Sequence, residues 1–329
     1  MSLTRTKIAA VGHYLPEYRL TNKELEAVVD TNDEWIRTRT GISERRILKD
    51  PDKATAFMGA EAAKEALAEA NIDAADVDLI IVATVTPDYL FPATACLIQN
   101  YIGANNAFAF DLSAACSGFL YALTTGTKYV ESGFAKNVLV IGADKMSSII
   151  DYTDRTTCIL FGDGAGAVLL QPSDDETGIH DHIHHSEGDT NCSLYQPGGG
   201  SINPATHETV DQLLHYVRQD GRAVFKKATM GMADVSSEIM EKNNLTADDV
   251  TWLVPHQANL RIIEATANRM GLSSEKVMIN IDKYGNTTAA TIPLCLYDWK
   301  HQLNKGDTLI LSAFGGGFTW GAIYLTWSL

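Results

Sequence analysis

Short apolar runs rich in β-branched residues alternate along this chain with segments of helical character. The apolar runs lie at residues 76–83, 107–112, 138–143 and 249–256. Helices are expected at about 54–70, 93–103, 221–243 and 259–270. The alanine-rich stretch 62–70 has a particularly strong intrinsic helix propensity. Strands that alternate with helices predict an α/β protein built from parallel-sheet units with helices on both faces.

This pattern repeats itself within the chain. Residues 107–143 and 277–313 each contain an apolar run, a cluster of small residues, a helical stretch and a second apolar run. The two copies keep a constant offset of 170 residues, so that Cys116 falls on Asn286 and Leu139 on Leu309. Unrelated α/β units also resemble one another, but an offset that holds through strand, helix and strand indicates a duplication.

The duplication predicts two pseudo-symmetric halves, residues 1–172 and 173–329. Each copy of the repeat is followed by a Phe-Gly-x-Gly motif and a further apolar strand, beginning at Phe161 and Phe314. The segment 173–210 interrupts the pattern with polar residues, a histidine-rich strand and a run of glycines. We interpret this segment as the crossover between the halves together with a surface insertion.

Composition and charge narrow the classes of function. No run of about 18 apolar residues suggests a membrane span, and the N-terminal residues 1–7 contain no apolar signal-peptide region. The net charge of −15 argues against nucleic-acid binding, which needs a basic surface. An anionic substrate or acidic partner would need a local basic patch. The five scattered cysteines form no C-x-x-C pair, which argues against a disulfide framework and favours the cytoplasm.

Cys116 is the first candidate for chemistry. It follows the strand expected at 108–112 and precedes the helix expected at 117–130. Ligands of open α/β sheets collect at the carboxyl ends of strands. A thiol at a helix N-terminus is expected to have a lowered pKa. Taken alone, however, a free cysteine is often a buried and inert core residue.

His256 and Asn286 strengthen the prediction of a site. His256 ends the strand expected at 252–255, and Asn286 follows a strand expected at 278–281 and a turn at Gly285. A single histidine at a strand end is more often structural. The pseudo-symmetry, however, brings three such polar strand ends to one place, which favours a shared catalytic site.

Other candidates are weaker. The glycines 162–166 resemble a phosphate-binding motif but lead into a strand, so we expect a tight turn between two strands there. His180, His182 and His184 alternate along one strand and could bind a metal, although a solvated strand face is more common. No metal site is therefore predicted. The chain contains no G-x-S-x-G motif, which argues against a serine hydrolase.

With these motifs the chain resembles β-ketoacyl-acyl carrier protein synthase III, a condensing enzyme of the thiolase-like superfamily. The resemblance covers nearly the whole chain. It is carried by Asn32-Asp-Glu-Trp-Ile-Arg-Thr-Arg-Thr-Gly-Ile, Ala114-Ala-Cys-Ser-Gly-Phe, Asp154-Arg-Thr-Thr, Phe161-Gly-Asp-Gly-Ala-Gly, Pro255-His-Gln-Ala-Asn, Tyr284-Gly-Asn-Thr and Phe314-Gly-Gly-Gly-Phe-Thr-Trp-Gly. The resemblance implies a thiolase-like α/β fold whose two βαβ-type halves form α-β-α-β-α layers.

The resemblance also implies a reaction. Cys116 would take an acyl group from acyl-CoA, and malonyl-acyl carrier protein would then lose CO2 and attack the thioester, which begins fatty acid synthesis. His256 and Asn286 match the pair that donates hydrogen bonds to the malonyl thioester oxygen. The amides of Cys116 and Gly316 match a second oxyanion hole. No cofactor is implied, because acyl-CoA is a substrate.

Further residues receive roles only from the resemblance. The residues that match contacts to CoA are Trp35, Arg39, Arg155 and Asn259. The residues that match the acyl pocket are Phe91, Phe161, Gln219 and Phe314, and Phe91 would reach the pocket of a partner subunit in a homodimer. The residues that match the docking patch for the acidic carrier protein are Lys226, Arg261 and Arg269. Without the resemblance, each of these basic residues is equally compatible with a solvated helix face.

The chain departs from the family pattern at three places. Gln219 stands where the family usually carries methionine, Asn268 stands where a second basic residue often lies, and the loop 190–212 is longer than in the shortest members. These departures concern acyl-chain preference and carrier affinity.

Four alternatives to this reading stay open. A related enzyme could use Cys116 for acyl transfer to an alcohol or amine. A thiolase is disfavoured because the glycine turn after Phe314 carries no second cysteine. A cysteine peptidase would need the histidine as a base for the sulfur. A non-catalytic scaffold would not need all three polar groups.

Overall fold

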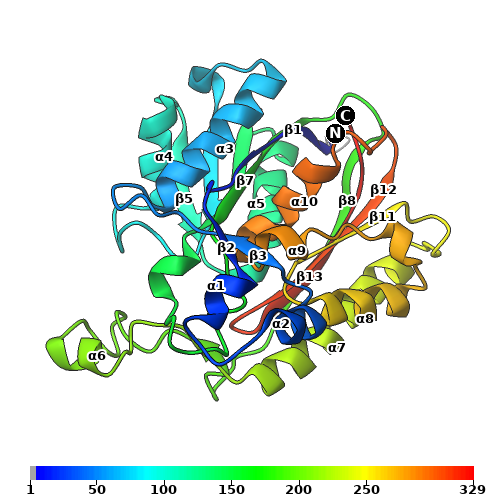
Figure 1. The fold of residues 1–329 in the computed structure, drawn as a ribbon. Helices are drawn as coiled ribbons and strands as arrows, with labels where there is room; N and C mark the ends of the chain where they lie inside the picture. The colour runs from blue at the N-terminus through cyan, green and yellow to red at the C-terminus, as the bar shows by residue number, and fades with distance from the viewer. Residues whose placement is uncertain (1–4) are drawn as a thin grey trace.

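A computed structural model describes residues 5–329 and shows two mixed β-sheets stacked between three layers of helices (Figure 1). The expected absence of a signal peptide concerns in part residues 1–4, which lie outside the described residues. No helix within residues 5–329 combines the length and the apolar character needed to cross a bilayer.

The first sheet has five strands in the order β1-β7-β6-β4-β5. They are β1 (Thr6–Tyr14), β4 (Leu79–Ala83), β5 (Phe108–Leu112), β6 (Val138–Asp144) and β7 (Gly164–Pro172). The strands β5, β4 and β6 run parallel, whereas β7 is antiparallel to both β6 and β1. The predicted parallel pairing is confirmed for β5, β4 and β6, the three strands of this sheet that alternate with helices. A parallel neighbour needs a crossover, and the chain between β6 and β7 forms only the short 3-10 helix η3 (Met146–Ile149).

The second sheet repeats this topology. Its order is β11-β12-β13-β8, formed by β11 (Trp252–Pro255), β12 (Thr308–Gly315), β13 (Thr319–Thr326) and β8 (Gly178–Ser186). The pair β11 and β12 is parallel, and β13 is antiparallel to β12 and to β8. The strands β8, β13, β12 and β11 therefore correspond to β1, β7, β6 and β4, as the duplication predicts.

Helices separate and cover the two sheets (Figure 1). The outer layer on the first sheet is α3 (Thr55–Ala70) with α4 (Thr94–Ile102), the middle layer is α5 (Gly118–Glu131) with α10 (Thr291–Trp299), and the outer layer on the second sheet is α7 (Gly221–Lys242) with α8 (Leu260–Met270). The predicted layered α-β-α-β-α fold is confirmed. The alanines of α3 let it lie very close to β1, where a Cβ on Gly12 would be 2.1 Å from the Ala62 carbonyl oxygen.

Smaller elements surround one end of the sheets. These are β2 (Arg19–Thr21), β3 (Glu44–Arg46), β9 (Leu194–Tyr195), β10 (Arg218–Gln219), α1 (Asn22–Glu26), α2 (Asp33–Thr40), α6 (His207–Asp211) and α9 (Ile281–Tyr284). The strands β2 and β3 form one two-stranded sheet, and β9 and β10 form another. The α6 segment projects from the body of the fold in Figure 1, as expected for a surface insertion.

The strand predicted at 278–281 is wrong. The second sheet retains only one isolated parallel bridge, between Leu253 and Val277, where β5 lies in the first sheet. The buried side chain of Gln257 replaces further pairing: its Oε1 accepts from the amides of Asn280 and Ile281, each at 3.1 Å, and its Nε2 donates to the Met278 carbonyl at 3.1 Å. Because these backbone groups are satisfied by a side chain, the segment turns into α9 instead of extending the sheet.

The glycine-rich segment after Phe161 is not a tight turn between two strands. β7 begins at Gly164, and the preceding residues lie extended beside Asn286. A Cβ on Gly162 would be 2.4 Å from the Tyr284 carbonyl oxygen, so glycine permits a close approach of two backbones there. The motif therefore brings the two halves into contact.

The histidine-rich strand β8 is not a solvated face. His184 contacts α5, where its Nε2 lies 2.8 Å from Thr124 Oγ1 and its ring centroid 4.4 Å from that of Tyr121. His180 stacks on Tyr324. Burial lowers the pKa of His184 to about 4, so this side chain is neutral near pH 7. The described residues contain no group of three or more side chains arranged to hold a metal ion.

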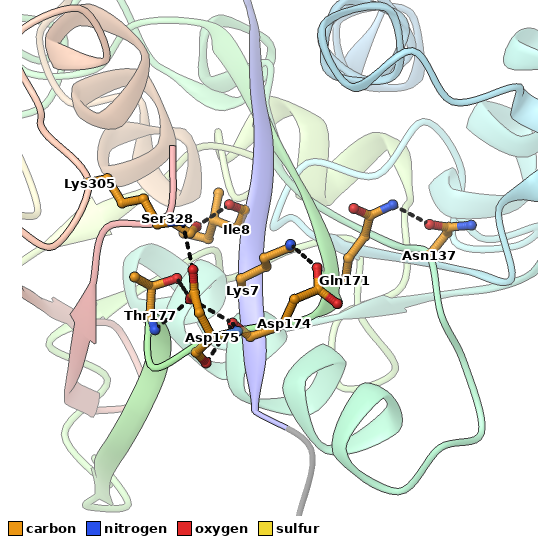
Figure 2. A network of polar contacts seen from close by, with 10 residues as sticks. Lys7, Ile8, Asn137, Gln171, Asp174, Asp175, Thr177, Lys305 and Ser328 are labelled. Carbon is orange, nitrogen blue, oxygen red and sulfur yellow. Dashed lines mark hydrogen bonds and ion pairs between the residues drawn. The ribbon is translucent and has the colours of Figure 1, made fainter.

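Polar contacts fasten the crossover between the halves to both of them (Figure 2). Lys7 of β1 pairs with Asp174 at 2.9 Å, and Lys305 near the start of β12 pairs with Asp175 at 2.6 Å. Ser328 near the C-terminus donates to the Ile8 carbonyl. The ion pairs are partly exposed, so solvent screens them and weakens their contribution to stability. They define the path of the crossover more than they stabilise the fold.

The contacts of Gln257 lead to a stability prediction. Replacing Gln257 by alanine leaves buried backbone groups of residues 255, 278, 280 and 281 without their partner. We expect the free energy of unfolding in urea to fall by about 3 kcal/mol, since each unsatisfied buried group costs about 1–3 kcal/mol and the segment relaxes in part. The control is Gln212→Ala, which removes an exposed side-chain contact to Glu208. Equal unfolding midpoints for the two variants would contradict this account.

Candidate active site

Cys116 lies where β5 passes into the middle helix layer. It is the central residue of the 3-10 turn η2 (Ala115–Ser117), which runs directly into α5. Ala115 has a φ of 48°, a conformation that few residues with a Cβ adopt, and it turns the chain sharply before the thiol. The Cys116 side chain is 7% exposed. A sharp turn at the end of a strand thus presents a buried thiol at the first turn of a helix.

The expected lowering of the Cys116 pKa is wrong for the free protein. Burial first, and then the nearby negative charge of Asp144, raise the pKa of this thiol to about 12. The backbone amide of Cys116 and a hydrogen bond from the Asn286 side chain act in the opposite direction but are outweighed. The free-energy cost of desolvating a fully buried thiolate exceeds the stabilisation that the first turn of the helix gives to the negative charge. Cys116 is therefore a neutral thiol at rest.

His256 follows β11 and is 1% exposed. Its backbone amide donates to the Ser312 carbonyl at 2.7 Å, which continues the pairing of β11 with β12 by one residue. Its Nδ1 lies 2.7 Å from the Thr291 hydroxyl at the start of α10. Burial lowers the pKa of His256 to about 3, so the imidazole is neutral at physiological pH. A neutral imidazole can donate one hydrogen bond without adding a charge.

Asn286 is held by backbone pairing with the other half of the molecule. Its amide donates to the Leu160 carbonyl at 2.9 Å, and its carbonyl accepts from the Gly162 amide at 3.0 Å. Its side-chain Oδ1 accepts from the Thr288 amide at 2.8 Å. This contact leaves the Nδ2 hydrogens to donate toward the Cys116 sulfur.

A buried network beneath these residues escaped the sequence reasoning. Asp144 accepts hydrogen bonds from the hydroxyls of Thr84, at 3.0 Å, and Thr288, and from the Val85 amide at 2.8 Å. Thr288 in turn holds Asn286 through its amide, so the carboxylate positions the carboxamide indirectly. The signal was present, because Asp144 ends β6 and is another polar residue at a strand end.

The three predicted residues line one small cavity of about 120 Å³. Cys116, His256 and Asn286 face it together, although they come from η2, the end of β11 and the segment after α9. Its walls include Phe161, Phe314, Gln219 and Asn259. The cavity therefore offers a thiol and two neutral hydrogen-bond donors within largely apolar walls.

A second, larger chamber of about 400 Å³ also borders the thiol. It is mostly apolar, and its lining includes Cys116, Phe161, Gly316, Met146, Ile149 and Val217. Of the four residues matched to an acyl pocket, only Phe161 lines this chamber. Gln219 and Phe314 line the smaller cavity beside His256, and the side chain of Gln219 is held there by the Thr156 carbonyl at 2.8 Å. Phe91 lines neither cavity and is 85% exposed.

Two pairs form among the residues matched to CoA. The Arg155 guanidinium lies 5.5 Å from the centroid of the Trp35 ring, a geometry that allows cation–π attraction. Asn259 caps α8 through its Oδ1 and donates from Nδ2 to the Arg39 carbonyl at 2.9 Å. Asn259 also lines the cavity of Cys116. These contacts join α2, where Trp35 and Arg39 lie, to the loop of Arg155 and to α8, on the side where the small cavity lies.

The three residues matched to carrier docking differ in their surroundings. Arg261, in the first turn of α8, lies 4.6 Å from the centroid of Phe225, whose side chain lines the small cavity. Lys226 lies on α7 beside a surface hollow. Arg269 is in the last turn of α8 and pairs with Asp234 at 3.5 Å. Arg261 thus lies nearest to the small cavity, while an acidic neighbour offsets the charge of Arg269.

Comparison with known proteins identifies the family. The family pattern described as 3-oxoacyl-[acyl-carrier-protein] synthase III matches residues 110–188, and that of its C-terminal part matches residues 240–327. The β-ketoacyl-[acyl-carrier-protein] synthase III of Chlorobaculum tepidum is 58% identical over 327 residues, which cover 98% of this chain and 99% of that protein. The chain belongs to the 3-oxoacyl-[acyl-carrier-protein] synthase III family. The Porphyromonas gingivalis member is 52% identical over 328 residues, covering 100% and 98% of the two chains.

Solved structures agree with this assignment. The synthase III of Aquifex aeolicus VF5 is 47% identical, with a TM-score of 0.90 and coverage of 98% of this chain and 100% of that chain. The priming β-ketosynthase of the R1128 polyketide biosynthetic pathway is 34% identical, with a TM-score of 0.92 and coverage of 100% and 98%. The fold of this synthase III family thus extends over the whole chain.

The raised pKa of Cys116 predicts a specific pH profile for alkylation. In the free protein, the rate at which iodoacetamide modifies Cys116 should rise about tenfold per pH unit from pH 8 to pH 10, because only the thiolate reacts and its fraction keeps rising below the pKa. Peptide mass mapping separates Cys116 from the exposed Cys192, and Cys116→Ala supplies the background. A plateau below pH 8 would mean that the pKa is lowered after all.

Proposed function

We propose that this chain condenses an acyl-CoA primer with malonyl-acyl carrier protein to form 3-oxoacyl-acyl carrier protein, with Cys116 as the acyl acceptor. The relatives carry the name of this activity, and they span the same length as the chain. The main support for the roles of individual residues is that Cys116, His256 and Asn286 line the same cavity.

In the first half-reaction, the Cys116 sulfur attacks the thioester carbonyl carbon of acyl-CoA. The bond from that carbon to the CoA sulfur breaks, and the thiol proton of Cys116 ends on the released CoA. The amides of Cys116 and Gly316 stabilise the tetrahedral oxyanion. The backbone of Gly315, which directly precedes Gly316, lies against the Cys116 amide: a Cβ on Gly315 would be 2.7 Å from that nitrogen. This proximity of the two backbone segments supports a shared oxyanion hole. The acyl chain then occupies the larger of the two cavities, the apolar chamber of about 400 Å³.

In the second half-reaction, malonyl-acyl carrier protein loses CO2 and forms an enolate. His256 and Asn286 donate hydrogen bonds to the enolate oxygen, and its carbon attacks the acyl-Cys116 carbonyl. The carbon–sulfur bond to Cys116 breaks, and the sulfur takes up a proton from solvent. The neutrality of His256 supports this role, because a donor without net charge stabilises the enolate and leaves the malonyl carboxylate free to depart. Acyl transfer to an alcohol or amine would not require this pair of donors.

Substrates would enter beside α2, α7 and α8. We assign Trp35, Arg39, Arg155 and Asn259 to CoA, and Lys226, Arg261 and Arg269 to the acidic carrier protein. The reaction needs no further cofactor. The free cysteines of the chain support a reducing compartment such as the cytoplasm.

We further propose a homodimer. Leu90 and Phe91 are each 85% exposed on the loop after β4, and Phe108 on the edge strand β5 is 40% exposed. Adjacent exposed apolar side chains and an open strand edge are typical of surfaces that associate. Phe91 would then close the acyl chamber of the partner subunit.

The residue roles predict a separation of the two half-reactions. Cys116→Ala should give no acyl adduct in the intact-protein mass after incubation with acyl-CoAs of graded length. His256→Ala and Asn286→Ala should still form the adduct, while condensation with malonyl-acyl carrier protein falls roughly 100- to 1,000-fold, the usual cost of losing one oxyanion donor. Cys192→Ala is the matched control and keeps both activities. An adduct that persists in Cys116→Ala, or disappears in His256→Ala, would refute these roles.

The assignment of Arg261 predicts a change in carrier affinity. Arg261→Glu should raise the KM for malonyl-acyl carrier protein about tenfold at low salt and less at high salt, because exposed charges are screened over roughly 8–10 Å. The control is Lys136→Glu, an equal charge reversal just before β6. If both variants change the KM alike, net charge and not a docking patch explains the effect.

A further inference from the structure

The hydrogen bonding of His256 raises a question about its tautomer. A neutral imidazole carries one hydrogen on two ring nitrogens, and only the form with hydrogen on Nε2 can donate from that nitrogen. Nδ1 is directed to Thr291, so Nε2 is the nitrogen left for the cavity shared with Cys116 and Asn286. The role proposed for His256 therefore requires that Nδ1 be an acceptor.

The Thr291 hydroxyl can meet this requirement. Its oxygen lies 2.7 Å from His256 Nδ1 and 3.1 Å from the Thr288 carbonyl, and it has one hydrogen to give. The Thr288 carbonyl already accepts from the backbone amide of Thr291. The shorter contact favours donation to Nδ1, and the Thr288 carbonyl keeps its amide partner when the hydroxyl hydrogen points to the imidazole. Both threonines are 2% exposed, so no bulk water competes for these groups.

The position of Thr291 in the fold makes the contact rigid. Thr291 is the first residue of α10, which lies in the middle layer and packs against β1, β7 and β11. His256 directly follows β11, and its amide is bonded to β12. The two side chains are thus carried by elements that pack together in the core, and neither belongs to a mobile surface loop.

We propose that Thr291 is a positioning residue that donates its hydroxyl hydrogen to His256 Nδ1 and so keeps the catalytic hydrogen on Nε2. This inference rests on the proposed role of His256 as a donor in condensation. Thr291 touches no reacting atom and acts through the imidazole alone. In the serine protease triad, similarly, a partner on the far nitrogen of the histidine determines its tautomer, and the wrong tautomer slows catalysis severely.

The tautomer can be observed directly. In protein with ¹⁵N-labelled histidine at pH 7, long-range ¹H–¹⁵N spectra distinguish a protonated ring nitrogen from an unprotonated one, and the His256 signals are assigned by their loss in His256→Ala. We expect Nε2 protonated and Nδ1 unprotonated in the unsubstituted protein, and a mixture of both forms in Thr291→Val. The predominance of hydrogen on Nδ1 in the unsubstituted protein would overturn the proposal, whatever the activities are.

Kinetics of the two half-reactions give a second readout. Thr291→Val should lower the kcat of condensation about 10- to 100-fold, a partial loss of one oxyanion donor, while the KM values and the single-turnover acylation of Cys116 change less than about threefold. Thr291→Ser keeps the hydroxyl and should restore condensation to within about fivefold. If Thr291→Val slows both half-reactions alike, or Thr291→Ser fails to restore the rate, a structural role explains the loss and the proposal is wrong.

A matched control separates this effect from the loss of any buried hydroxyl. Thr266 is fully buried in α8, and its hydroxyl donates to the Ile262 carbonyl at 2.9 Å. Thr266→Val should leave both the His256 tautomer and the rates unchanged, and a shift there equal to that of Thr291→Val would contradict the proposal. His256→Ala tests the underlying function independently: if it condenses at the normal rate, the proposed donor role fails even where the tautomer is as expected.

Discussion

The backbone pairing between residues 160–162 and Asn286 is the contact on which the site depends. It joins the two halves of the duplicated fold at the point where their strand ends meet. Gly162 makes the close approach of the two backbones possible. The hydrogen bond from Thr288 to Asp144 holds the segment that follows Asn286. Without this pairing Asn286 would have no defined position relative to Cys116, because the two residues come from opposite halves.

Burial governs the electrostatics of the cavity. It keeps Cys116 as a thiol and His256 as a neutral imidazole, so the resting site carries no net charge on the groups that face the cavity. Asp144 is the nearest carboxylate, but hydroxyl and amide donors surround it. The basic side chain of Arg261 lies near the small cavity, on a chain whose net charge is −15. Under the proposed mechanism, such side chains would bind the anionic substrates, and no cation would lie beside the enolate.

Several elements could be predicted from the sequence because they depend on local pattern. The helices α3, α4, α7 and α8 and the repeated strand order follow from apolar periodicity and from the constant offset. The predictions failed where a distant side chain or backbone intervened. Gln257 takes the hydrogen bonds that a strand at 278–281 would have used, and desolvation overrides the helix N-terminus at Cys116. Neither effect has a signature in the neighbouring residues.

The sequence by itself determined the fold class, the duplication and the family, and it singled out Cys116, His256 and Asn286 as candidates, because repeated strand and helix patterns place polar residues at strand ends. Only the tertiary structure decided how these side chains are held and in which protonation state. Thr291, Thr288 and Asp144 act through contacts between residues far apart in the chain, and the pKa values depend on how completely the packed core excludes water. Both are properties of three-dimensional packing and not of any local stretch of sequence.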